Sequence, residues 1–381
     1  MSSSVAYSNV DTIERGPPSE VLKTASGHNI EVYKTEKPRP KVESSNLGFG
    51  RTISDHMVVC EWVNGEWGPC RIVPYANFKL DPASKAIHYG QEIFEGMKAY
   101  KWNDGSLALF RPYDNARRFN ESAERVCMPA VPEELFVESL EALLKIDQDW
   151  VPNEKGFSMY IRPTMIGCDS FLGVAPASRY VFFTILSPSA PYFSGGFKGI
   201  SIFVERDFVR AFKGGVGEAK TGGNYASTLS VTAKAQKLGF NQVLWTNAGD
   251  HTTVEEVGAA TFFCVRKGVV TTPPLTGTIL RGITRSSILE LAKSCGYPTA
   301  EEEVTVQDLF DEIKSGDISE IFCCGTAACV TPVCKVGSEN ETVVVSDGNP
   351  GKITTELYEK LVGIQMGNVD DLFGWTSKVE N

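Results

Sequence analysis

The chain carries no excess of positive charge. Its 381 residues include 37 Lys and Arg against 47 Asp and Glu, which gives a formal net charge of −10. This balance argues against polyanionic partners, because nucleic acids and anionic membrane surfaces attract cationic proteins. No apolar run approaches the ~20 residues that a membrane-spanning helix requires. We therefore expect neither nucleic acid nor a membrane as a partner.

Metal ligands and targeting signals are also scarce. The ten cysteines include no C-x-x-C pair, and only four histidines could assist them, so no metal is predicted. The thiols are interpreted as structural ones in a reducing compartment, with a redox role for Cys323, Cys324, Cys329 and Cys334 left open. Residues 1–20 contain few cations and no apolar core, unlike a secretory signal or a mitochondrial presequence. A cytoplasmic location is expected.

The composition is that of an ordinary globular protein, long enough for two domains. Hydrophobic residues make up 42% of the chain and charged residues 22%. Residues 1–45 are polar and proline-containing, and are predicted to form a loose arm. The Pro-, Gly- and Ser-rich residues 188–199 are predicted to link a small α/β domain, 46–187, to a larger domain, 200–381.

The first domain is expected to mix strands and helices. Strands are predicted at 57–63, 157–167 and 179–187, and a hairpin at 97–110 turns at Asn103–Gly105. A helix is expected near Asp114, which would serve as its N-cap, and another at 133–149.

The second domain alternates strand-like and helical segments. Strands are predicted at 200–205, 241–247, 260–268 and around 321–333, with helices from about 225 and from about 282. Several strand pairs are joined by short turns. An α+β, mixed-sheet architecture is therefore expected rather than a doubly wound parallel sheet.

Lys220 is the most informative residue, because it stands alone between glycine pairs in GGVGEAKTGGNY. It could bind phosphate as a P-loop lysine, form a Schiff base, or be an ordinary surface cation. The P-loop template fails, because Ala219 replaces its second glycine and the residues after Thr221 resist helix formation. The other two interpretations stay open at this point.

Four further segments carry groups that a phosphorylated aldehyde cofactor would need. Arg118 could hold phosphate, and Glu256 could pair with a ring nitrogen. Gly282 precedes a helix whose first amides could bind an anion, as could the small-residue turn Gly325–Ala328. Each segment alone is equally compatible with a structural role.

Together these segments resemble the branched-chain amino-acid aminotransferases of the fold-type IV pyridoxal-phosphate class. The match runs from about Phe49 to Trp375. It rests on DHMVVCEW, DPASKAIHYGQEIFEGMKAY, NARRF, YIRP, GGVGEAKTGGNYA, the E-V-G turn, GITR and CGTAACVTPV, in this order. The resemblance implies two domains with the cofactor site at their interface.

The resemblance also implies roles for individual residues. Lys220 would form the Schiff base with pyridoxal 5'-phosphate and move the proton at the substrate α-carbon. The other cofactor-binding residues would be Tyr225 at the phenolic oxygen, Glu256 at the pyridine nitrogen, Arg210 behind them, and Arg118, Ile283, Thr284 and Thr326 at the phosphate.

Substrate recognition follows in the same way. The amides of Ala327 and Ala328 would bind the α-carboxylate. Tyr89, Phe94, Tyr160 and Tyr192 would line an apolar pocket. Arg162 would accept the second carboxylate of glutamate, so that one pocket serves two kinds of side chain.

The implied reaction is ping-pong transamination of L-leucine, L-isoleucine and L-valine with 2-oxoglutarate, by a homodimer. D-amino-acid aminotransferases and aminodeoxychorismate lyases of the same fold type are alternatives, as is a catalytically silent cofactor-binding protein.

The chain departs from the family after the E-V-G turn. Ala259, Ala260 and Thr261 stand where many relatives carry Thr or Gly, Met and Asn. This departure is expected to remove polar side chains from the cofactor ring. Only Cys329 follows the GTA turn, so the C-x-x-C redox switch of some animal members is not expected.

Overall fold

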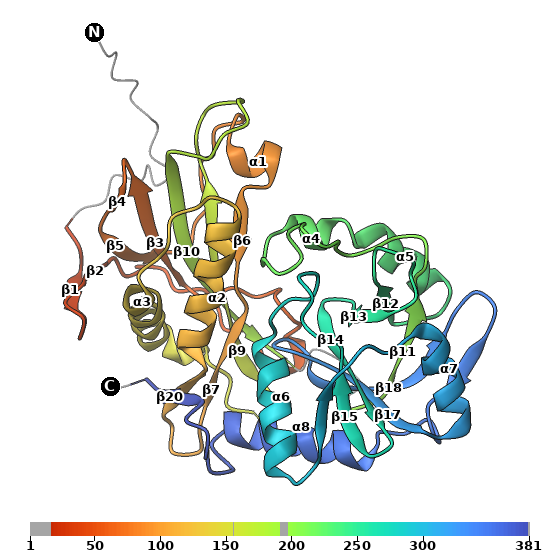
Figure 1. The fold of residues 1–381 in the computed structure, drawn as a ribbon. Helices are drawn as coiled ribbons and strands as arrows, with labels where there is room; N and C mark the ends of the chain where they lie inside the picture. Colours follow the sequence, from red (N-terminus) through yellow and green to blue (C-terminus); the bar gives the residue numbers. More distant parts are fainter. Residues whose placement is uncertain (1–16, 155, 191–196, 380–381) are drawn as a thin grey trace.

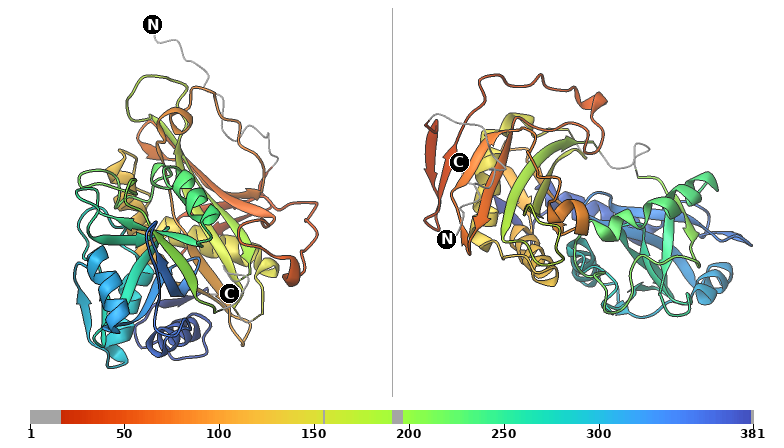
Figure 2. Two further views of the ribbon diagram at one scale, coloured as in Figure 1. Left: turned by 90° about the vertical axis from the view of Figure 1, so that its right-hand side faces the viewer. Right: turned by 90° about the horizontal axis from the view of Figure 1, so that it is seen from above.

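The computed structural model describes residues 17–154, 156–190 and 197–379. Two units, each built on its own sheet, lie side by side in Figure 1, and Figure 2 shows them from two further directions. None of the helices in the described residues has the length and hydropathy of a bilayer span.

The first unit is a sheet of eleven strands in the described residues. Its order is β1-β2-β5-β3-β10-β9-β7-β8-β20, with β4 paired to β3 and β6 to β9. The strands are β1 (Glu20–Lys23), β2 (Asn29–Val32), β3 (His56–Val63), β4 (Glu66–Trp67), β5 (Cys70–Pro74), β6 (Glu92–Phe94), β7 (Met97–Lys101), β8 (Leu107–Phe110), β9 (Ser158–Gly167), β10 (Arg179–Ser189) and β20 (Thr376–Lys378).

Helices α2 (Pro112–Arg125) and α3 (Glu133–Ile146) pack on this sheet, and the short α1 (Lys85–Tyr89) lies at its end. Phe119 of α2 and Phe136 of α3 meet Phe182 of β10, with ring centroids 5.6 and 5.7 Å from the Phe182 ring. All three rings are fully buried. This aromatic cluster fixes α2, which carries Arg118, against the sheet.

The second unit is a mixed sheet, as predicted. Its order is β13-β12-β11-β18-β17-β14-β15-β16, with β19 paired to β18. The β11–β12, β11–β18 and β15–β16 pairs are parallel, and the other pairs are antiparallel. The strands are β11 (Ile200–Val204), β12 (Gln242–Thr246), β13 (Val254–Val257), β14 (Ala260–Arg266), β15 (Val269–Thr272), β16 (Thr299–Glu301), β17 (Ile318–Gly325), β18 (Cys329–Gly337) and β19 (Thr342–Val344).

Five helices belong to this unit in the described residues: α4 (Gly223–Ala226), α5 (Leu229–Lys237), α6 (Ile283–Ser294), α7 (Val306–Ser315) and α8 (Lys352–Gln365). Leu289 and Leu291 of α6 and Leu361 of α8 join a buried cluster with strands β14 and β17. Because α6 is held by this apolar face, its N-terminus is fixed relative to the sheet.

Three predicted boundaries were wrong in part. Residues 20–23 and 29–32 are strands rather than loose arm, because Ile30 and Val32 alternate with polar residues and are fully buried. The last strand, β20, lies in the first unit rather than in the predicted domain 200–381, since it pairs with β8. β10 continues to Ser189, which shortens the linker, and residues 1–16 of the predicted arm lie outside the described residues.

The predicted hairpin is confirmed, since β7 and β8 pair antiparallel around the Asn103–Gly105 turn. The predicted N-cap was wrong. Helix α2 begins at Pro112 after Arg111, and Asp114 lies in the first turn. The fixed φ of proline favours the first helical position, so Pro112 sets the start. Asp114 accepts a bond from Nε of Arg111 at 2.7 Å.

Candidate active site

A cavity of about 220 Å³ lies where the two units meet, and residues of both units line it. All predicted site residues except Arg210, Tyr89 and Tyr192 are among the lining residues. These are Phe94, Arg118, Tyr160 and Arg162 from the first unit, and Lys220, Tyr225, Glu256, Ile283, Thr284, Thr326, Ala327 and Ala328 from the second. Residues more than 200 positions apart in the sequence are thus brought together at one site.

Lys220 is held by backbone contacts with the first unit. Its N–H donates to Oγ of Ser122 at 2.9 Å, and its carbonyl accepts from the N–H of Phe94 at 3.0 Å. Its Nζ donates to the hydroxyl of Tyr225 at 2.9 Å. Gly217 lets this loop approach closely, because a Cβ there would lie 2.6 Å from the carbonyl oxygen of Thr278. The lysine is therefore aimed at the cavity rather than free on a surface loop.

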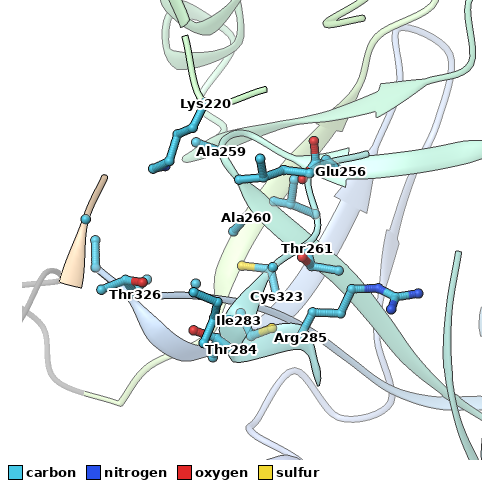
Figure 3. A pocket seen from close by; sticks show the side chains of 18 of the residues that line it. Lys220, Glu256, Ala259, Ala260, Thr261, Ile283, Thr284, Arg285, Cys323 and Thr326 are labelled. Atoms are coloured by element: carbon cyan, nitrogen blue, oxygen red, sulfur yellow. The ribbon is translucent and has the colours of Figure 1, made fainter. Parts of the chain in front are cut away.

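Glu256 lies on the same side of the cavity as Lys220 in Figure 3. It belongs to β13, just before the turn to β14, and only 4% of it is exposed. Nε of Arg210 lies 2.6 Å from its Oε2. Burial raises the pKa of Glu256, the neighbouring Glu255 adds to this, and the Arg210 guanidinium opposes it. Arg210 thus favours the carboxylate form in a buried place.

The opposite side of the cavity is suited to anions, and Figure 3 places Ile283, Thr284 and Thr326 there. Gly282 is extended, and no side chain caps α6. The first amides of this helix, at Ile283 and Thr284, therefore have no side-chain acceptor and carry the positive end of the helix dipole.

Arg118 adds a guanidinium to this side, and a buried acid fixes its orientation. Nε and Nη2 of Arg118 donate to the two carboxylate oxygens of Glu95 at 2.7 and 2.8 Å. Nη1 donates to the carbonyl of Arg281 at 3.1 Å. Glu95 is fully buried. Sequence reasoning missed Glu95, which stood unremarked in the HYGQEIFEGMKAY segment.

A tight turn between β17 and β18, which contains Thr326, forms part of the cavity wall. Gly325 pairs with Cys329, which leaves Thr326, Ala327 and Ala328 as the loop. Cys329 takes a left-handed φ of 57°, which few residues other than glycine adopt. Successive amides in such a turn form a concave anion site.

The remaining wall is aromatic. The rings of Phe94 and Tyr225 lie 4.9 Å apart. Nη2 of Arg162 donates to the hydroxyl of Tyr160 at 2.9 Å, and its Cζ lies 4.7 Å from the centroid of the Phe94 ring. Phe49, which sequence reasoning noted only as the start of the match, packs edge-on to Tyr160 at 4.7 Å. No periodicity or motif around Phe49 signals this position.

Three predicted site residues lie elsewhere. Arg210 stands behind Glu256 and contacts its Oε2. Tyr89 does not line the cavity, because α1 holds it at the end of the sheet, 44% exposed, with its hydroxyl bonded to the carbonyl of Leu172. Tyr192 lies outside the described residues.

The departure at residues 259–261 leaves one hydroxyl in the cavity, that of Thr261. Thr261 lines the cavity and is 4% exposed. Its Oγ1 lies 3.1 Å from the position that a Cβ on Gly282 would take. The hydroxyl of Thr261 is therefore next to the start of α6.

Two cysteines line the cavity as free thiols. Burial raises the pKa of Cys323 to about 12 and that of Cys324 well above its usual range. A thiol reacts as its thiolate, so neither residue is activated as a nucleophile. The described residues contain no group of three His, Cys, Asp or Glu side chains that could hold a metal ion.

Residues 92–336, the part of the chain that supplies most of this cavity, match the family described as Amino-transferase class IV. The chain belongs to the class IV aminotransferases. The branched-chain-amino-acid transaminase 1 of Bacillus subtilis is 45% identical to it over 350 residues, which cover 91% of this chain and 97% of that protein. The branched-chain-amino-acid aminotransferase of Mycolicibacterium smegmatis is 42% identical over 88% of this chain and 93% of that protein.

Solved structures of branched-chain aminotransferases share the fold. The branched-chain aminotransferase of Escherichia coli superposes with a TM-score of 0.70 at 27% identity, and the match covers 84% of this chain and 99% of that one. The T.th. branched-chain aminotransferase with pyridoxamine 5'-phosphate gives a TM-score of 0.68 at 26% identity, over 84% and 98% of the two chains. The predicted fold class is confirmed.

The Arg118–Glu95 pair provides a stability test of the site. Glu95→Ala should lower the free energy of unfolding by about 3 kcal/mol or more, because it leaves a buried guanidinium without its counter-ion. The double variant Glu95→Ala/Arg118→Met should lose much less of its free energy of unfolding, since both charges are absent. Urea unfolding of the three proteins measures the difference. An unchanged transition midpoint in Glu95→Ala would show that the pair is not buried as described.

Proposed function

We propose that the protein transfers the amino group of L-leucine, L-isoleucine and L-valine to 2-oxoglutarate, using pyridoxal 5'-phosphate, and releases branched-chain 2-oxo acids and L-glutamate. The observation that carries this proposal is the position of Lys220, whose Nζ is held by Tyr225 in a cavity with a buried carboxylate on one side and an anion site on the other. The names of the relatives support the branched-chain reaction over the D-amino-acid and lyase alternatives.

The residues of the cavity fit this cofactor. Arg118, the free amides of Ile283 and Thr284 and the hydroxyl of Thr326 would hold its phosphate, as phosphates bind at helix N-termini and to guanidinium groups. The hydroxyl of Thr261 would join them. Glu256 would pair with the protonated pyridine nitrogen, and Tyr225 would donate to the phenolic oxygen. The group supplies an electron sink for the carbanion that forms when the α-proton leaves.

The chain itself contributes the proton transfer. Nζ of Lys220 would take the proton from the substrate α-carbon and give it back at the carbon on the far side of the amino nitrogen, which requires the neutral amine. The hydroxyl of Tyr225, 2.9 Å from Nζ, keeps the amine oriented for this proton transfer. Arg210 favours the carboxylate form of Glu256, which would stabilise a positive charge facing it.

The wall formed by Phe94, Tyr160 and Arg162 would accept both kinds of side chain. Leucine, isoleucine and valine would contact the rings and exclude water. The γ-carboxylate of glutamate or 2-oxoglutarate would reach Arg162, whose Nε is buried and has no hydrogen-bond partner among the described residues. The α-carboxylate, which both substrates share, would bind at the amides of Ala327 and Ala328.

The proposal includes a homodimer. Large exposed side chains gather on α1 and on the connection between β9 and β10, and a second copy would cover them: Ile87, Tyr89, Phe171, Leu172 and Val174. Because Tyr89 lies on this surface and does not line the cavity, its proposed role in substrate binding would require the second copy. A cytoplasmic location stays a prediction.

Replacement of Lys220 tests the function. Lys220→Ala should lower the rate of L-leucine-dependent glutamate formation by at least ~10³-fold, because the proton at the α-carbon then has no acceptor. Lys213→Ala, an exposed lysine of the same loop, should keep the wild-type rate. A coupled assay with L-leucine and 2-oxoglutarate measures both variants. Full turnover by Lys220→Ala would exclude the proposed role.

A methyl group on Gly96 tests the aromatic wall. In Gly96→Ala the new Cβ would overlap the hydroxyl of Tyr160, while Cζ of that ring would lie at 3.1 Å. The displaced ring should raise the Michaelis constant for L-leucine roughly tenfold, as overpacking of 1–3 kcal/mol predicts. In a Tyr160→Phe background the same methyl should have a much smaller effect. Equal effects of the methyl in the two backgrounds would contradict the steric explanation.

A further inference from the structure

A lysine of the first unit supports the turn at which the α-carboxylate is proposed to bind. Lys98 lies on β7, and its Nζ donates to the carbonyl oxygen of Ala327 at 3.0 Å, across 229 residues of sequence. The resemblance gave Lys98 no role, and the cofactor and substrate contacts proposed above do not use it.

The surroundings of Lys98 are poor in negative charge. No carboxylate of the described residues lies within ion-pair distance of its ammonium. The neighbouring groups are the thiol of Cys329 and, next to that thiol, the amide of Gln365, which also accepts a bond from the hydroxyl of Tyr100 at 2.9 Å. Burial lowers the pKa of Lys98. A partly buried cation with one neutral acceptor gains most from an anion that arrives nearby.

The bond to Ala327 connects this cation to the substrate. The carbonyl of Ala327 and the N–H of Ala328 belong to one peptide group. An ammonium on the oxygen of a peptide draws electron density from its nitrogen, which makes the N–H a stronger donor. Lys98 would therefore strengthen the N–H of Ala328, which is one of the two amides proposed to bind the α-carboxylate.

We propose that Lys98 is a positioning residue for the substrate α-carboxylate: it holds and polarises the Ala327–Ala328 peptide and brings a positive charge to the back of the carboxylate site. This inference rests on the function proposed above. It assigns the two substrate carboxylates to different cations, because Arg162 serves only the γ-carboxylate of glutamate and 2-oxoglutarate. Lys98 serves the carboxylate that every substrate of the reaction carries.

The assignment predicts a distinct kinetic pattern. Lys98→Met keeps the length of the side chain and removes its charge. It should raise the Michaelis constants for L-leucine and for 2-oxoglutarate by similar factors, roughly tenfold for a lost charge-assisted bond. Arg162→Gln should raise only the Michaelis constant for 2-oxoglutarate. Lys98→Arg, which keeps the charge, should recover part of the loss.

Binding of two leucine fragments separates positioning from folding. The holoenzyme is titrated with 4-methylvaleric acid, which has the carboxylate without the amine and is bound in a solved structure of the T.th. branched-chain aminotransferase. It is also titrated with 3-methylbutan-1-amine, which has the amine without the carboxylate. Changes in the visible spectrum of the cofactor measure the binding of both fragments. Lys98→Met should weaken the binding of 4-methylvaleric acid roughly tenfold and leave the binding of the amine unchanged.

Two results would overturn the inference. Wild-type affinity of Lys98→Met for 4-methylvaleric acid would show that the charge does not act on the carboxylate. An equal loss of affinity for the acid and for the amine would show a general disturbance of the cavity. If the wild-type protein turns over L-leucine in either case, only the role of Lys98 fails. If the wild-type protein binds neither fragment and does not turn over L-leucine, the proposed function fails with it.

Discussion

The segment Glu92–Lys98 carries the contacts on which the geometry of the cavity depends. The carbonyl of Glu92 accepts from the hydroxyl of Thr221, and the N–H of Phe94 donates to the carbonyl of Lys220. Glu95 orients Arg118, whose Nη1 reaches the carbonyl of Arg281 in the second unit. Lys98 reaches the turn at Ala327. One short stretch of the first unit thus contacts the lysine loop and the Ala327 turn of the second unit directly, and it reaches Arg281 through Arg118.

Charge is separated across this cavity. A buried carboxylate and its guanidinium partner, Glu256 and Arg210, stand on one side, and cations and uncapped amides stand on the other. Interactions between charges are stronger in such a partly buried place than in water. A ligand with a cationic ring nitrogen and an anionic phosphate would therefore favour one orientation in the cavity that Lys220 lines.

The features that could be predicted from the sequence are local ones. A lysine between glycines, a helix that starts after Gly282 and the Gly325–Ala328 turn are each defined by a few consecutive residues, and their order supported the resemblance. Their assembly into one cavity was expected only from that resemblance, and the structure brings them together.

The features that were missed depend on contacts between distant residues. Glu95 meets Arg118 across 23 residues and Lys98 meets Ala327 across 229, so no spacing rule joins them. Phe49 enters the cavity from a segment without strand or helix periodicity, and β20 returns to the first sheet because Phe110 and Trp375 pack together at 5.8 Å. The place of the Thr261 hydroxyl beside Gly282 was not predicted, because it depends on α6, which follows Thr261 by more than 20 residues.

The most direct test of the account is the visible spectrum of the purified protein with its cofactor. The account predicts an absorption band of a lysine-bound aldehyde cofactor, which L-leucine bleaches and 2-oxoglutarate restores, while D-alanine leaves it unchanged. A band that L-leucine does not alter, or that D-alanine bleaches instead, would contradict the central claim that this cavity transfers the amino group of branched-chain L-amino acids.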